Sequence, residues 1–229
     1  MLGRLRHLLG RAAAPLLGRR GKGCHELRYW RERKAAEGNL FNHHYVPYYT
    51  EHFGLSTADY AGKWVLDIGC GPRGSLEWAT MAARRVGIDP LAKEYLKLGA
   101  DKHQMEYVAV PAETMPFEAR SFDIVCSFNS LDHVDDVNRV IDEIKRVAKP
   151  GGMLLLLVEI NHPPTSTEPH ALGPELVRRF EPEFRCERMA VYRPVPGGLY
   201  DSIERAETVP DPFETHQVGW LSARFRKTT

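Results

Sequence analysis

Glycines and carboxylates that could bind a nucleoside gather around residues 65–74, whose sequence is VLDIGCGPRG. Gly69, Gly71 and Gly74 follow an apolar run, and glycine allows the backbone to turn sharply and to approach a ligand closely. Asp89 ends the next apolar run, in VGIDP, eighteen residues after Gly71. At that place in a wound parallel sheet, an acid can accept hydrogen bonds from both hydroxyls of a ribose.

The charge of Asp67 distinguishes among the nucleotides that such a loop could bind. Glycine patterns of this kind also occur in dinucleotide enzymes, so the glycines alone leave the ligand open. A carboxylate just before the turn would repel a pyrophosphate and attract a ligand with sulfonium and ammonium groups. We therefore expect a cationic nucleoside rather than NAD. Asp89 has a second interpretation as the N-cap of a helix beginning near Pro90, and the two roles are compatible.

The elements that must position these residues form an alternating pattern from Trp64 onward. Apolar runs alternate with helical patterns, which predicts an α/β fold whose parallel sheet is wound by crossover helices. A turn-rich loop and a short helix then precede two strands of alternating character, which suit an antiparallel pair at the end of the sheet. The expected strands are 64–68, 85–88, 106–110, 122–128, 153–159, 184–192 and 218–225, and the expected helices are 26–37, 45–53, 75–84, 91–98, 134–148 and 175–180.

The chain divides by composition into a basic start, residues 1–25, and one domain, residues 26–229. The start holds six arginine or lysine residues and no acid, although the whole chain has a formal net charge of only +1. Leucines at helical spacing among these cations fit a segment lying on an anionic membrane surface, an organelle targeting segment, or a solvated tail. Within the domain we expect a helical cap at 26–63, a ligand-binding core at 64–160, and a substrate loop with C-terminal strands at 161–229.

Several motifs resemble the class I S-adenosylmethionine-dependent methyltransferases, in the branch that modifies small molecules, lipids and glycans. They are VLDIGCG, VGIDP, VPAETMPFEARSFDIVCSFNSLDHVDD, and RVAKPGG before LLLLVE, and together they cover about residues 64–159. The resemblance implies a seven-stranded Rossmann-like sheet with helices on both faces and a C-terminal antiparallel pair. Pro72 and Arg73 depart from the family pattern, which more often has a small residue followed by glycine.

The same resemblance implies a set of residues that bind S-adenosylmethionine. Asp67 and the first two glycines would hold its methionine part, and Asp89 would hold its ribose. Ala112 and Glu113, which follow the third strand, would flank its adenine. The end of the fourth strand would form the wall that faces the acceptor. The full set is Asp67, Gly69, Cys70, Gly71, Asp89, Pro90, Ala112, Glu113, Ser127, Phe128 and Asn129.

The acceptor side carries fewer signals. YWRERKAAEGNLFNHHYVPYYTEHFGL, SFNSLDHVDD and VEINHPPTSTEPH are also similar to methyltransferases of bacterial polysaccharide and glycan gene clusters. This similarity implies that the acceptor is a hydroxyl of a glycan, a nucleotide sugar or another small metabolite. Two rival functions stay open: a catalytically silent protein that binds the cofactor and a partner, and an NAD-type enzyme on a related fold.

Methyl transfer from a sulfonium is an in-line displacement, so positioning alone supplies much of the acceleration and a base is optional. A sugar hydroxyl would gain from a base, and His133 or His162 is the candidate, since both follow strands at the carboxyl edge of the sheet. Each histidine has an alternative role in structure or in acceptor contact. The expected acceptor-binding residues are Tyr45, Tyr48, Asp132, Glu159, Asn161 and His170.

No metal site is expected from the spacing. The carboxylate, amide and imidazole groups at the carboxyl edge are suitable ligands, but they match no tight ligand motif. The four cysteines are widely separated and include no C-x-x-C pair, which argues against a zinc site and a compact disulfide framework. We expect a reducing, cytoplasmic setting, no nucleic-acid partner, and membrane contact, if any, through the basic start.

Overall fold

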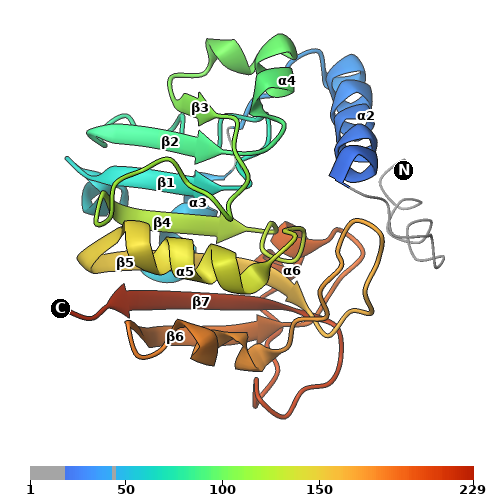
Figure 1. Ribbon diagram of the computed structural model, residues 1–229. Coiled ribbons are helices and arrows are strands. Elements are labelled where there is room, and N and C mark those ends of the chain that lie inside the picture. The colour runs from blue at the N-terminus through green and yellow to red at the C-terminus, as the bar shows by residue number, and fades with distance from the viewer. Residues whose placement is uncertain (1–18, 43–44) are drawn as a thin grey trace.

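A seven-stranded sheet forms the centre of the computed structural model, which describes residues 19–42 and 45–229 (Figure 1). The strand order is β3-β2-β1-β4-β5-β7-β6. Strands β1 to β5 are parallel, and β7 runs antiparallel to both β5 and β6. The expected α/β sheet with a C-terminal antiparallel pair is therefore confirmed. The strands are β1 (Trp64–Ile68), β2 (Arg84–Ile88), β3 (Glu106–Val108), β4 (Phe122–Phe128), β5 (Ala148–Ile160), β6 (Phe184–Tyr192) and β7 (Gly219–Lys227).

Strand β5 holds the two halves of the hydrophobic core together. Its residues alternate between the faces of the sheet, as side chains in any strand do. Leu154 and Leu156 pack with the apolar side of α5 (Val137–Val147), whereas Leu155 and Leu157 pack with aromatic residues of the N-terminal segment. Because both faces are covered, the strand is apolar along most of its length.

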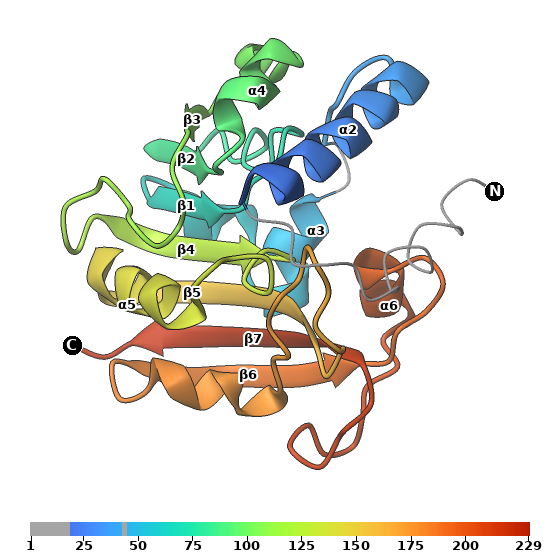
Figure 2. The same ribbon diagram turned by 45° about the vertical axis from the view of Figure 1, so that its right-hand side comes forward.

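The helices cover both faces and one edge of the sheet. Helix α2 (Arg19–Glu37) begins seven residues earlier than expected, and it lies beyond the carboxyl ends of β1 and β2 (Figures 1 and 2). The predicted helix at 45–53 is two short pieces, α3 (Val46–Tyr49) and a 3₁₀ turn (Glu51–Phe53). The others are α4 (Ala92–Lys97), α6 (Leu199–Arg205), which the sequence did not predict, and 3₁₀ helices Thr57–Tyr60, Ala100–Lys102 and Pro174–Phe180.

The expected helix at 75–84 is wrong. Backbone bonds there span three residues, from Glu77 N to Gly74 O and from Ala79 N to Leu76 O, so the chain makes successive turns until β2 begins. Trp78 packs against Tyr60 from these turns, with ring centroids 4.8 Å apart. The glycine loop therefore lacks the helix N-terminus that favours a pyrophosphate.

The basic start is only partly described. Residues 1–18 lie outside the described residues, and from Arg19 the chain belongs to α2, so the expected boundary near residue 25 falls inside a helix. None of the helices in residues 19–42 and 45–229 is long and apolar enough to cross a membrane.

Candidate active site

Asp67 lies at the end of β1 with its carboxylate in the interior of the protein. The hydroxyl of Tyr49 donates a hydrogen bond of 3.0 Å to its Oδ2. Burial raises the pKa of Asp67 to about 7, and the bond from Tyr49 opposes that rise. A buried carboxylate of this kind gains its charge most easily when a cation binds beside it.

The loop after Asp67 packs directly on the end of β4. Gly69 has a φ of +69°, and a Cβ at this position would lie 2.3 Å from the Cβ of Ser130. The Ser130 hydroxyl donates to the carbonyl of Ile68 at 2.8 Å and lies 2.8 Å from the hydroxyl of Ser127. Gly69 is thus required both for its backbone conformation and for this close contact.

Asp89 follows β2 and is buried beside the same loop. Its Oδ1 accepts a 2.8 Å bond from the backbone N–H of Leu91. Leu91 itself is the N-cap of α4, so Asp89 holds the chain just before the helix and is not the N-cap that the sequence predicted. Burial is the main cause of a rise in the pKa of Asp89 to about 7, and the charge of Glu26 adds to it. Pro90, next in the chain, is exposed.

Helix α2 lies over the glycine loop. A Cβ at Gly71 would lie 3.6 Å from the indole of Trp30, and the guanidinium of Arg73 lies 5.5 Å from the centre of that indole. One terminal guanidinium nitrogen of Arg73 also donates to both carboxylate oxygens of Glu37, at 3.0 Å to Oε1 and 2.7 Å to Oε2. The Pro72-Arg73 departure from the family pattern therefore has a structural use, since Arg73 fixes the end of α2.

Glu26 brings the same helix to the side of the loop where Asp89 lies. Its Oε1 accepts bonds from the Tyr95 hydroxyl at 3.1 Å and from the Trp30 indole at 3.3 Å. Further toward the start of the helix, Lys22 pairs with Asp135 at 3.2 Å. Helix α2 therefore spans the carboxyl edge from β2 to the segment after β4.

The residues expected around the adenine and at the acceptor wall lie at the ends of β3 and β4. Glu113 is buried, and its Oε1 accepts backbone bonds from Asp135 and Asp136, so its carboxylate supports the turn before α5. Phe128 packs against Tyr49 with ring centroids 4.4 Å apart. The other members are Cys70, Ala112 and Ser127, which are buried, and Asn129, which is exposed and has a φ of +51°.

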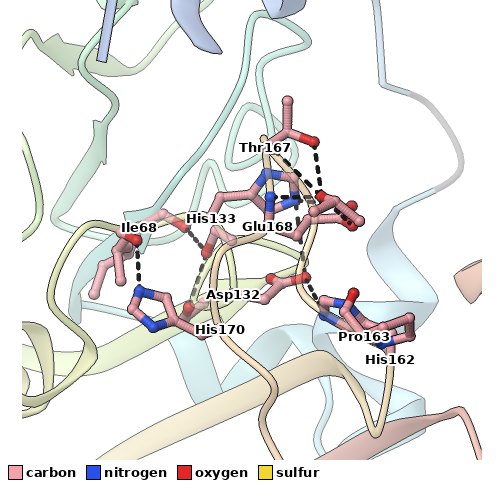
Figure 3. Close-up of polar contacts among 12 residues, drawn as sticks. Ile68, Asp132, His133, His162, Pro163, Thr167, Glu168 and His170 are labelled. Atoms are coloured by element: carbon pink, nitrogen blue, oxygen red, sulfur yellow. Dashed lines mark hydrogen bonds and ion pairs between the residues drawn. The ribbon is translucent and has the colours of Figure 1, made fainter. Parts of the chain in front are cut away.

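A histidine–carboxylate cluster lies at the carboxyl edge beyond β4 (Figure 3). We use this name for Asp132, His133, His162 and Glu168, which come from three separate segments. His133 Nε2 lies 3.9 Å from Asp132 Oδ2 and 3.8 Å from Glu168 Oε1. Burial lowers the pKa of His133, but the charges of Asp132 and Glu168 outweigh it and the net shift is upward.

His162, the second candidate base, lies on the inner side of this cluster. Its Nε2 is 3.9 Å from Asp132 Oδ2, and its Nδ1 is 3.0 Å from the carbonyl of Pro163. Burial raises the pKa of Asp132. The structure thus brings both candidate histidines to a single carboxylate.

The other expected acceptor residues are occupied by contacts within the protein. Tyr48 donates a 2.5 Å bond to Glu204 of α6, and Tyr45 packs against Tyr200 of that helix. Asn161 donates to the carbonyls of Thr215 and Gln217, and His170 Nε2 bonds to the carbonyl of Val134. Glu159 is buried in β5, opposite Trp220. Acceptor contact by these residues stays a prediction.

Sequence reasoning missed Tyr49, Trp30 and Glu26. Tyr48 and Tyr49 are neighbours, and consecutive helical residues point in different directions, so their types alone do not show which one reaches Asp67. The position of α2 over the glycine loop depends on tertiary contacts between Arg73 and Glu37, which are far apart in sequence.

Comparison with known proteins gives the family. A family model described as a methyltransferase domain matches residues 66–156. A ubiquinone biosynthesis O-methyltransferase of Paraburkholderia phymatum is 35% identical over 147 residues, which cover 61% of this chain and 62% of that protein, so this chain spans less than two thirds of that relative. The protein of the same name from Stutzerimonas stutzeri is 34% identical over 164 residues, covering 68% of this chain and 67% of that protein.

Solved structures agree on the fold. The cyclase SpnF superposes with a TM-score of 0.64 at 17% identity, covering 95% of this chain and 100% of that one. An S-adenosylmethionine-dependent methyltransferase from Mesorhizobium loti superposes with a TM-score of 0.55 at 19% identity, covering 73% and 92%. The matched domain contains the glycine loop, Asp67, Asp89 and the end of β4. This chain belongs to the class I S-adenosylmethionine-dependent methyltransferases.

Proposed function

We propose that this chain transfers the methyl group of S-adenosylmethionine to a hydroxyl oxygen of a small-molecule acceptor. The observation that carries the proposal is the histidine–carboxylate cluster beside the cofactor loop. It follows β4, next to β1 in the sheet, so it lies at the same carboxyl edge as Asp67. Ligands of wound α/β sheets bind at this edge.

The cofactor side supports a cationic ligand. Asp67 and Asp89 are buried carboxylates on either side of the glycine loop. Among the described residues, Asp67 accepts from the Tyr49 hydroxyl and Asp89 from the backbone N–H of Leu91, and neither donor is a basic side chain. Sulfonium and ammonium groups would provide the opposite charge. Residues 75–83 make turns where a dinucleotide site would use a helix N-terminus, which disfavours the NAD-type alternative.

The acceptor side supports oxygen. The two relatives described above are named O-methyltransferases. A hydroxyl is a poor nucleophile while it keeps its proton, and groups within hydrogen-bond reach of it can accept that proton. His133 and His162 are the residues of the cluster that we propose for activating the acceptor. His133 is the more accessible of the two, so the acceptor meets the cluster at His133.

The narrower acceptor class follows from the resemblance to glycan methyltransferases and from the names of the relatives. We propose two classes of acceptor compound for testing, which we call the two arms of the assay. One arm contains nucleotide sugars or oligosaccharides with free hydroxyls, and the other contains aromatic compounds with a phenolic hydroxyl. The cyclase among the structural neighbours shows that this fold also carries other reactions. Transfer must therefore be measured directly.

The test uses S-adenosylmethionine labelled in its methyl group. We expect release of S-adenosylhomocysteine and appearance of the label on an oxygen of an acceptor from one arm. His133→Ala is expected to bind the cofactor as the wild type does and to turn over at least tenfold more slowly. Label on nitrogen or carbon, or tight binding of NAD with no binding of the methyl donor, would contradict the proposal. Cofactor binding without release in any arm would support the silent-partner alternative.

A further inference from the structure

We propose that the histidine–carboxylate cluster is a binding site for a divalent first-row transition-metal ion such as Mn²⁺, and that this ion holds the acceptor's hydroxyl oxygen. The second part rests on the proposed function, whereas the ion site itself does not. The spacing of the four residues predicted no metal site, because they come from three segments that only the folded chain brings together.

The donor atoms lie at distances suited to one ion. One atom each from Asp132, His133 and Glu168 lies within 4.8 Å of the other two, so these three residues are the ligands that we assign to the ion. His162 Nε2 lies 3.9 Å from Asp132 Oδ2 and faces the same carboxylate from the inner side. These separations are too long for direct hydrogen bonds. They are near those between ligands that each lie about 2.0–2.2 Å from a shared ion.

The two inner residues have buried polar atoms that nothing in the described protein satisfies. The side chains of Asp132 and His162 are 1% and 3% exposed. Both carboxylate oxygens of Asp132 and the Nε2 of His162 lack a hydrogen-bond partner among the described residues. Leaving such groups unpaired inside a protein costs about 1–3 kcal/mol each, more for a charge, so a ligand between them is expected.

The tautomer of His162 strengthens this assignment. The carbonyl of Pro163 can only accept, so the 3.0 Å contact requires the proton on Nδ1. In neutral His162 the Nε2 lone pair then faces the oxygens of Asp132, and two lone-pair donors face each other across 3.9 Å. Histidines that bind metals commonly donate their other ring N–H to a backbone carbonyl in this way.

The carboxylate and imidazole groups of the cluster indicate which class of metal ion it would bind. Two carboxylates carry a charge of about −2 between them, which a dication matches, and the imidazole of His133 favours a transition metal over Mg²⁺ or Ca²⁺. His133 and Glu168 are the outer members, with side chains 34% and 26% exposed. A coordination position on that outer side is the place for the acceptor oxygen.

The ion would activate the hydroxyl as a Lewis acid. The O–H bond of the coordinated hydroxyl breaks, and its proton passes to solvent water, because a His133 nitrogen that binds the ion cannot also accept the proton. Without the ion, His133 is the base given under the proposed function. The oxygen then forms a bond to the methyl carbon while the carbon–sulfur bond of S-adenosylmethionine breaks, which leaves S-adenosylhomocysteine. No oxidant or reductant is needed.

The test begins with the full-length protein after chelator treatment and dialysis. Titration with Mn²⁺ alone, followed by electron paramagnetic resonance, is expected to show one bound ion per chain. Asp132→Asn keeps the size of the side chain and is expected to weaken Mn²⁺ binding at least tenfold. Glu175→Gln changes an exposed carboxylate outside the cluster and is the matched control. Circular dichroism of each variant establishes that it is folded.

Binding of Mn²⁺ to the wild type, lost in Asp132→Asn and kept in Glu175→Gln, would support the site whether or not methyl transfer is observed. Absence of stoichiometric Mn²⁺ binding to the wild-type chain would overturn it, even if transfer proceeds. The role in transfer is tested separately: chelation is expected to lower turnover at least tenfold, and Mn²⁺ to restore it. Full turnover in the presence of chelator would overturn that role and leave the proposed function intact.

Discussion

At the scale of single residues, Asp67 combines a cost in stability with its proposed role in cofactor binding. Its pKa is about 7 in the folded chain because it is buried, against about 4 for an exposed aspartate. The folded chain thus keeps a proton that the unfolded chain has lost between these values. The free energy of unfolding is therefore expected to fall as pH rises from about 4 to about 7.

We predict that Asp67→Asn stabilises the ligand-free protein and weakens cofactor binding. Asparagine cannot ionise, so at about pH 8 the variant avoids the buried charge, and its melting temperature should exceed that of the wild type by several degrees. Wild-type affinity for S-adenosylmethionine should rise several-fold from about pH 6 to about pH 7.5, as Asp67 and Asp89 ionise. Calorimetric titration at each pH measures this rise, which should be smaller in Asp67→Asn. An equal pH dependence in both proteins would exclude Asp67 as a source of it.

Asp89 permits a second prediction at this scale. Asp89→Ala removes both a potential ribose contact and the bond to Leu91 N. Hydrogen bonds to charged groups contribute about 1.5–3 kcal/mol, so cofactor affinity should fall by about 10- to 100-fold. Asp89→Asn keeps an acceptor for Leu91 and should lose less, which separates the ribose contact from the loop contact. Unchanged affinity in Asp89→Ala would refute the ribose role.

The sequence predicts the position of a site residue well when that position follows from its own strand, and poorly when it depends on contacts with residues far away in the sequence. Asp67 and Asp89 follow strands whose apolar runs are plain, so their positions at the edge of the sheet could be read directly. Glu168 lies close to His133 although 35 positions separate them in the sequence, and no rule of residue spacing predicts such a contact. Acceptor contact by Tyr48 stays a prediction, and the bond from its hydroxyl to Glu204 joins residues 156 positions apart, which the sequence could not show.

At the scale of elements, strands were predicted better than the segments that connect them. Strands β4 and β6 have the expected bounds because burial on the sheet imposes a period of two or a continuous apolar run. The segment 75–84 has helix-forming residues, but the packing of Trp78 on Tyr60 accompanies turns there instead. Helix α6 was missed because it is only seven residues long and follows a Pro- and Gly-containing stretch.

Helix α2 is the element whose role is most open to test. Trp30 lies over Gly71, so we predict that Trp30→Ala weakens S-adenosylmethionine binding by about three- to tenfold, mainly through faster release. Stopped-flow and calorimetric measurements separate the release rate from the affinity. Arg28→Ala on the same helix is the control, because Arg28 is exposed and forms an ion pair with Glu32 of the same helix. Equal losses in the two variants would indicate a general effect on α2 rather than a contact at the loop.

At the scale of the whole molecule, the sheet order places the cofactor loop and the cluster beside each other. β1 and β4 are neighbours although 53 residues separate the end of the first from the start of the second. The connections of β1 run to one side through β2 and β3, and those of β4 run to the other side through β5. The crevice at this reversal is where α/β sheets bind ligands. Alternating strands and helices predicted this arrangement, whereas the covering by α2 required the folded chain.

The whole molecule should also report which nucleotide it binds through its thermal stability. A ligand that binds only the folded chain at about 100 times its dissociation constant adds about 2.7 kcal/mol to the free energy of unfolding. For a chain of this size, that corresponds to a rise of about 5–10 °C in melting temperature. We predict such a rise with S-adenosylmethionine, a similar one with S-adenosylhomocysteine, and none with NAD at the same concentration. Asp89→Ala should require a higher concentration for the same rise, since the gain depends on the ratio of the ligand concentration to the dissociation constant. A rise with NAD that equals the rise with S-adenosylmethionine would show that the two carboxylates beside the glycine loop do not select the charge of the ligand.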